Sequence, residues 1–218
     1  MHVHPLLMNI DDHIKFFNPL DDVEKHRTNL PHWQQSGATY FVTFRLADAL
    51  PATQLRDWKL DRNFWLEAHP KPWTEAEERE YHERFSSTIE HWLDAGHGSC
   101  LLRKPQHTRV IGNALAHFDH QRCVQHAWVV MPNHVHALFT LLAEHDLESI
   151  LHSWKSYTAK QIKPGGTLWQ RDYFDRMIRS RDHFQNCVRY IRRNPSKAKL
   201  RAGDFLAHEA EWISKIVT

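Results

Sequence analysis

Residues 127–136 read Ala-Trp-Val-Val-Met-Pro-Asn-His-Val-His, and this stretch decides the fold. The apolar start predicts a β-strand, Met-Pro-Asn predicts a tight turn, and a second strand begins at His134. The strands, from Cys123 to Val130 and from His134 to Leu142, form a predicted β-hairpin. Because side chains at i and i+2 share one face of a strand, His134 and His136 lie together.

The elements on either side of this hairpin predict the fold class. They alternate between segments rich in β-branched and aromatic residues and segments with apolar residues at helical spacing. This order predicts an α+β fold, a ferredoxin-like antiparallel sheet with helices on one face, plus a helical insertion. The other predicted elements are a strand at 39–46, the insertion at 52–98, a helix at 108–119, a helix from a cap at Asp146 to about Lys163, a possible strand within 167–179, and a helix from about Arg181 to Asn194 that ends before Pro195.

One domain accounts for most of the chain. We expect it to cover residues 37–200, with the insertion at about 52–98, an N-terminal arm at 1–36 and a C-terminal tail at 201–218. Within the insertion, Thr74-Glu-Ala-Glu77 has the spacing of a capping box at a helix start.

Composition excludes several classes of protein. The three cysteines, Cys100, Cys123 and Cys187, are far apart, which argues against a disulfide framework or a zinc ribbon. The first ten residues lack the pattern of a signal peptide, and no apolar run is long enough to cross a membrane. We therefore expect a cytoplasmic, nucleoid-associated protein with no membrane partner.

The charged residues are unevenly distributed, although the net charge is only +2. Residues 48–94 hold 11 acidic and 6 basic residues, whereas residues 155–201 hold 13 basic and 3 acidic ones. A basic C-terminal third indicates a polyanionic partner such as a nucleic acid. The predicted DNA-binding residues are Lys155, Lys160, Arg171, Arg176, Arg179, Arg189, Arg192 and Arg193.

The histidine pair is a candidate metal site. Among 19 histidines, about one or two His-x-His pairs arise by chance, so spacing alone favours metal ligation and hydrogen-bonded structural histidines about equally. Tyr157 and Gln161 are four residues apart on a predicted helix and share a face. With the histidines, they would supply the groups needed to break a phosphodiester bond, with Tyr157 as nucleophile. Tyr173 is a reserve nucleophile.

These motifs resemble a known family. His134-Val-His136 after Met131-Pro-Asn, followed by Tyr157-x-x-x-Gln161, resembles the single-tyrosine HUH transposases, and in particular their REP-associated branch. Three further segments resemble that branch: Thr43-Phe-Arg-Leu46, Trp169-Gln-Arg-Asp-Tyr-Phe-Asp-Arg176 and Tyr190-Ile-Arg-Arg-Asn-Pro195. The likeness as a whole covers roughly residues 33–50 and 100–200.

The resemblance implies cleavage and joining of single-stranded DNA beside a hairpin of the REP type. It implies Mg²⁺ or Mn²⁺ held by His134, His136 and Gln161, and a 5′-phosphotyrosine formed at Tyr157. It leaves open whether the protein acts as a monomer or a homodimer.

Two other functions compete with this one. A non-catalytic module would bind single-stranded nucleic acid, yet the aromatic motif of RNA-recognition domains is missing from the sequence. A phosphodiesterase that uses water as nucleophile would need further acidic ligands, and the nearest downstream candidates, Glu144, Asp146 and Glu148, lie in or near a helix cap.

Overall fold

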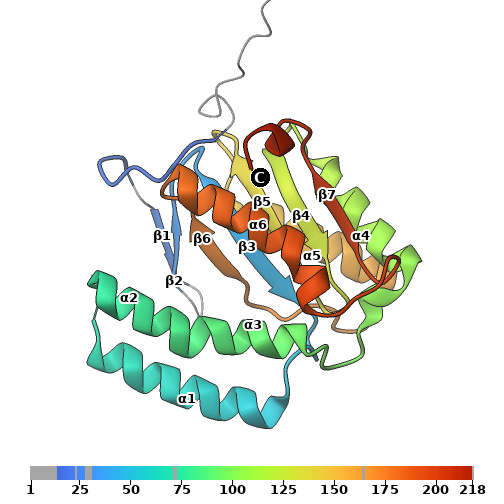
Figure 1. Ribbon diagram of the computed structural model, residues 1–218, viewed down its shortest axis with the longest axis horizontal. Coiled ribbons are helices and arrows are strands. Elements are labelled where there is room, and N and C mark those ends of the chain that lie inside the picture. The colour runs from blue at the N-terminus through green and yellow to red at the C-terminus, as the bar shows by residue number, and fades with distance from the viewer. Residues whose placement is uncertain (1–13, 23, 28–30, 71–72, 164, 218) are drawn as a thin grey trace, which may run out of the picture.

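A single antiparallel sheet of five strands forms the centre of the computed structural model, which describes residues 14–22, 24–27, 31–70, 73–163 and 165–217 (Figure 1). The predicted α+β class, with an antiparallel sheet and a helical insertion, is confirmed. The strands in spatial order are β6 (Phe174–Met177), β3 (Thr39–Arg45), β5 (His134–Leu141), β4 (Cys123–Val130) and β7 (Leu206–Glu209).

Helices cover both faces of this sheet. Helices α4 (Pro105–His117) and α5 (Leu147–Ile162) pack on the face that carries Val135 and Phe139. Helix α6 (Arg181–Lys197) packs on the opposite face, in front of the sheet in Figure 1. The ferredoxin-like helices α4 and α5 thus share one face as predicted, but α6 does not join them. Every residue of β5 is buried, which requires apolar cover on both sides.

The hairpin β4–β5 is at the centre of the molecule. Its strands pair in register with Val130 opposite Val135, and the Met131 amide donates to the His134 carbonyl at 2.8 Å to close the turn. Strand β3 pairs with the other edge of β5, so that Thr43 lies opposite His136 and Arg45 opposite His134.

The predicted insertion is helical and runs past one end of the sheet. Helix α1 (Ala52–Ala68) lies beside α2 (Glu75–Tyr81), a π-helical turn (His82–Ser86) and α3 (Ser87–Asp94) (Figure 1). The predicted capping box forms, because the Thr74 amide donates to Glu77 Oε2 and the Glu77 amide donates to Thr74 Oγ1. Ile89 and Leu93 join α3 to the main core.

The two ends of the chain differ from the prediction. The predicted tail contributes β7 and a 3₁₀ turn (Ile213–Lys215), and the predicted arm contains a two-stranded sheet, β1 (Glu24–Arg27) with β2 (Pro31–Gln34). Much of the arm, residues 1–13, 23 and 28–30, lies outside the described residues. Helix α6 continues through Pro195 to Lys197, past its predicted end at Asn194, and the proline costs this last turn one backbone hydrogen bond because it has no N–H.

None of the helices in the described ranges is both long enough and apolar enough to cross a membrane.

Candidate active site

The two histidines of the hairpin converge on one point. His134 and His136 are fully buried on β5, and their Nε2 atoms are 3.0 Å apart. Two imidazole nitrogens that bind one ion at about 2.1 Å, at right angles to each other, also lie about 3 Å apart. The pair therefore has the separation of two ligands of a shared metal ion.

Each histidine is held from behind through its Nδ1 atom. His134 Nδ1 is 2.7 Å from Asn133 Oδ1, and His136 Nδ1 is 2.7 Å from Thr43 Oγ1. Because the Asn133 oxygen can only accept, His134 carries its proton on Nδ1 and presents an Nε2 lone pair to the site. Partners of this kind fix the ring orientation of metal-binding histidines.

Both imidazoles are neutral. Burial, and then the nearby charge of Arg45, lower the pKa of His134 from 6.5 to about 3. Burial also lowers the pKa of His136 well below its usual value, and the charges of Lys197 and Arg176 act in the same direction. A neutral imidazole keeps the lone pair that a metal ion requires.

Helix α6 places Tyr190 and Asn194 against these histidines. The Tyr190 ring meets His136 edge to face, with centroids 5.1 Å apart, and Asn194 Nδ2 is 3.4 Å from His136 Nε2. Tyr190 and Asn194 are four residues apart, so they share one face of the helix. Phe41 stacks on His136 at 5.4 Å and meets the Tyr190 ring edge to face at 5.8 Å, so the three rings form one cluster.

Two polar atoms of this cluster, Tyr190 Oη and Asn194 Oδ1, are buried and make no hydrogen bond of good geometry to a described residue. The Asn194 side chain nonetheless lies close enough to the Tyr190 phenol to act on it as a hydrogen-bond partner and lower its pKa. A buried polar atom that lacks a good hydrogen bond lowers the stability of the fold by about 1–3 kcal/mol, so folded proteins rarely keep one without a function. The structure turns Asn194 Nδ2 toward His136 Nε2, so the amide must flip to present its oxygen to an ion at the histidines. Two imidazole nitrogens with one amide oxygen then fit a divalent cation such as Mn²⁺ or Mg²⁺.

The third protein ligand would have to be this amide. Within the part of the chain that the structure describes, no three His, Cys, Asp or Glu side chains form a group that could hold a metal. His134, His136 and Asn194 are therefore the residues that fit the predicted ion.

Charged groups surround the tyrosine. Burial raises the pKa of the Tyr190 phenol above its usual range, as do the negative charges of Glu90 and Asp94 on α3, whereas Arg176 on β6 opposes them. Lys197, on the last turn of α6, pairs with Asp94 at 2.7 Å. Arg176 and Lys197, on two different elements, thus bring positive charge to the cluster of the histidines and Tyr190.

The structure does not bring Tyr157 and Gln161 to the histidines. Both lie exposed on α5, and Tyr157 has 52% of its surface open to solvent. Helix α5 packs through Trp154 on Phe139, whose side chain points away from the histidine face. The reserve nucleophile Tyr173 is buried in the same α5-side core. The predicted roles of Tyr157 and Gln161 need revision, because the sheet separates these residues from the ion-binding pair.

The sequence did contain a signal for the helix that contacts the histidines. Tyr190 and Asn194 repeat the four-residue spacing of Tyr157 and Gln161, and they fall inside the segment Tyr190–Pro195. The apolar stripe of α6, which includes Cys187 and Ile191, continues into the buried Asn194. A polar residue at the end of an apolar stripe indicates a buried site at that position.

The predicted DNA-binding residues divide between the two sides of the sheet. Lys155, Lys160 and Arg171 lie on or beside α5, whereas Arg189, Arg192 and Arg193 lie on α6 and Arg176 and Arg179 lie on or just after β6. Of these eight predicted residues, Arg176 is the one that acts on the pKa values of His136 and Tyr190.

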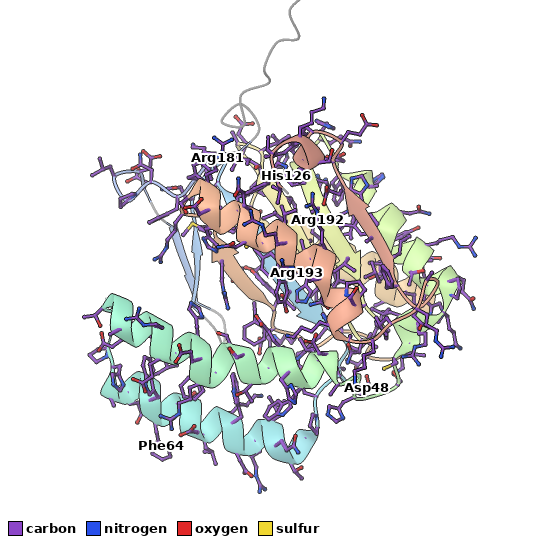
Figure 2. All side chains as sticks on the ribbon, in the orientation of Figure 1. Asp48, Phe64, His126, Arg181, Arg192 and Arg193 are labelled. Atoms are coloured by element: carbon purple, nitrogen blue, oxygen red, sulfur yellow. The ribbon has the colours of Figure 1, made fainter. Side chains whose placement is uncertain are left out.

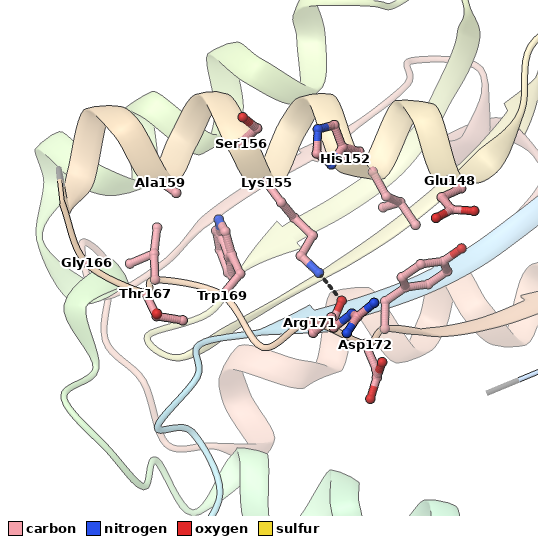
Figure 3. A pocket seen from close by; sticks show the side chains of 13 residues that line it. Glu148, His152, Lys155, Ser156, Ala159, Gly166, Thr167, Trp169, Arg171 and Asp172 are labelled. Carbon is pink, nitrogen blue, oxygen red and sulfur yellow. Dashed lines mark hydrogen bonds between the residues drawn. The ribbon is translucent and has the colours of Figure 1, made fainter. Parts of the chain in front are cut away.

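A cavity of about 480 Å³ lies on the α5 side (Figure 3). Lys155 crosses it and donates to the Arg171 carbonyl at 2.6 Å, and burial lowers the pKa of Lys155 to about 8. Trp169 is buried, forms part of its wall and donates to Thr158. The cavity is therefore distinct from the histidine cluster.

Arg192 is expected to stabilise the fold rather than contact DNA (Figure 2). Its guanidinium donates twice to Glu209 of β7, at 2.8 Å each, and once to the Val217 carbonyl. Arg192→Ala should lower the free energy of unfolding by about 1–2 kcal/mol, measured by urea denaturation.

Arg193 is the matched control, since it is exposed and no described residue pairs with it. Arg193→Ala should leave unfolding unchanged and make the salt dependence of single-stranded DNA binding shallower. Equal stability of the Arg192→Ala variant and the wild type would contradict the structural role of Arg192.

Comparison with known proteins gives the same family as the sequence motifs. Residues 104–194 match a family model described as "Transposase IS200 like", which spans somewhat less than half of the chain and includes the hairpin and most of α6. The resemblance predicted from the sequence is thus confirmed at the level of this family. A solved structure titled "Structure of the REP associates tyrosine transposase bound to a REP hairpin" also matches, with a TM-score of 0.41, 18% identity, and coverage of 78% of this chain and 74% of that chain. A search of curated proteins found no match.

Proposed function

Since residues 104–194 match the IS200-like transposases, we propose that this protein cleaves and rejoins single-stranded DNA beside a hairpin through a phosphotyrosine at Tyr190. The observation that carries the proposal is the contact of Tyr190 and Asn194 with the His134–His136 pair under α6. It replaces Tyr157 and Gln161 with the tyrosine and amide that the fold places at the histidines.

The covalent step follows from these positions. Tyr190 Oη attacks the scissile phosphorus, the Oη–P bond forms, and the P–O3′ bond breaks to release a 3′-hydroxyl. The product is a 5′-phosphotyrosine ester, so a free 3′-hydroxyl can attack it and rejoin strands without another energy source. Because the pKa of Tyr190 is raised, its proton leaves during the attack rather than before it, and the departing O3′ takes up one proton, so no proton is gained or lost overall.

The other residues bind and orient the reactants. His134, His136 and Asn194 would hold Mn²⁺ or Mg²⁺, which polarises the phosphate and aligns it for in-line attack when bound. Arg176 and Lys197 supply positive charge beside Tyr190 for the phosphate. Burial of the histidines and of Tyr190 limits the access of water, which favours transfer to tyrosine over hydrolysis.

A denaturing gel tests the proposal directly. Purified protein is incubated with labelled single-stranded DNA that carries a hairpin and its flanks, with Mn²⁺, with Mg²⁺ or with a chelator. We expect a protein–DNA band that survives denaturation and forms only with a divalent ion. DNA with a scrambled stem is the control for the hairpin, and it should give much less adduct.

The two competing functions, a phosphodiesterase that uses water and a non-catalytic binding module, predict different results on this gel. Cleaved DNA without a covalent band would indicate water as the nucleophile. Binding without cleavage across a library of hairpins and flanks would indicate a non-catalytic binding module. Either result would overturn the proposed mechanism.

A further inference from the structure

The end of the helical insertion touches the back of the candidate site. Asn133, which holds His134, is itself held by two backbone carbonyls at the end of α3: its Nδ2 donates to Leu93 O at 3.2 Å and to His97 O at 3.1 Å. Carbonyls only accept hydrogen bonds, so these contacts fix which end of the Asn133 amide faces His134.

The end of the insertion and the residue after it are held in four ways. Leu93 is buried in the main core, and the Ser99 amide donates to Asp48 Oδ2 at 2.9 Å. A Cβ atom added at Gly98 would lie 2.3 Å from the Asp48 carbonyl oxygen, so only glycine fits there. Asp94 pairs with Lys197 on the helix that carries Tyr190 and Asn194. The end of α3 thus has little freedom to shift.

We propose that the 52–98 insertion is a positioning element of the active site, which orients His134 through the Asn133 amide. The orientation of His134 does not depend on the proposed function, and only its effect on catalysis rests on that function. The chain of contacts runs from Leu93 O and His97 O to Asn133 Nδ2, and from Asn133 Oδ1 to His134 Nδ1. It leaves the His134 Nε2 lone pair directed at His136 Nε2.

A glycine substitution outside the site tests the first link. Gly98→Ala must displace the 96–99 loop and with it the His97 carbonyl, because the new Cβ meets backbone rather than a flexible side chain. Gly203→Ala is the matched control, since Gly203 has a similar positive φ but open space around it. Both variants carry backbone strain, and only the first reaches Asn133.

Two measurements that need no DNA report the result. We expect Gly98→Ala to weaken Mn²⁺ binding, measured by electron paramagnetic resonance, by tenfold or more, and Gly203→Ala to leave it unchanged. Imidazole ¹⁵N shifts, assigned with a His134→Gln variant, should show a mixed tautomer for His134 in Gly98→Ala and a single Nδ1–H tautomer in the wild type. Unchanged shifts in a folded Gly98→Ala protein would overturn the proposal.

Asn133→Asp tests the proposal against the simpler one that the contact with His134 alone orients residue 133. It also replaces Gly98→Ala as the test if that variant does not fold. A carboxylate still accepts from His134 but cannot donate to the two carbonyls, which repel it. If the insertion orients residue 133, His134 loses its single tautomer and Mn²⁺ binding falls. If the contact with His134 alone suffices, the carboxylate is the stronger acceptor, so the tautomer persists and the proposal fails. A wild-type protein that shows the predicted tautomer but forms no adduct would contradict the proposed function and leave this inference standing.

Discussion

Tyr190→Phe is expected to abolish the covalent protein–DNA adduct, whereas Tyr157→Phe should form it at the wild-type rate. Only Tyr190 touches the histidine pair, and phenylalanine lacks the oxygen that would bond to phosphorus. The loss should exceed about a thousandfold in single-turnover adduct formation, because no other group supplies the nucleophile. The measurement is a time course on a denaturing gel with excess protein.

The substitution should leave the rest of the site intact. The hydroxyl of Tyr190 is buried and makes no hydrogen bond of good geometry, and Asn194 is the side chain that acts on it, so its removal affects at most that one amide. We therefore expect equal or slightly higher thermal stability and unchanged binding of single-stranded DNA by Tyr190→Phe. An adduct that survives in Tyr190→Phe and disappears in Tyr157→Phe would return the nucleophile to α5 and refute our assignment.

The hairpin and its histidines were predictable because strand patterns are local. Alternation places His134 and His136 on one face whatever the rest of the chain does, and the Met131-Pro-Asn turn fixes where the second strand begins. The cap at Asp146 was predictable for the same reason, since it depends on residues three positions apart.

The choice between the two tyrosine helices was not local. Both Tyr157–Gln161 and Tyr190–Asn194 have the spacing of a shared helix face, and spacing alone does not say which face of the sheet each helix covers. Helix α6 connects β6 at one edge to β7 near the other, so it must cross the sheet. Because α4 and α5 already occupy one face, α6 takes the face of the histidines. That argument depends on strand β7, and from the sequence its residues were predicted to be a C-terminal tail rather than a strand. The sequence alone therefore did not show that α6 crosses the sheet.

Asn194→Ala is expected to weaken Mn²⁺ binding by about a hundredfold, whereas Gln161→Ala should not change it. Asn194 is buried against His136 and its Oδ1 makes no hydrogen bond of good geometry, whereas Gln161 is exposed on the far side of the sheet. With only His134 and His136 left, the site keeps two imidazole nitrogens and loses its oxygen donor. Titration calorimetry or electron paramagnetic resonance of Mn²⁺ measures the loss.

Asn194→Asp distinguishes a ligand from a structural contact. A carboxylate is a harder donor than an amide, so this variant should bind Mg²⁺ and Mn²⁺ at least as tightly as the wild type. If Asn194 only packed against His136, a buried carboxylate beside neutral imidazoles would instead destabilise the fold and give no gain in ion affinity. Weak ion binding in both Asn194 variants and in Gln161→Ala alike would exclude the side chain of residue 194 as a ligand. The third donor would then have to be an oxygen of the DNA phosphate.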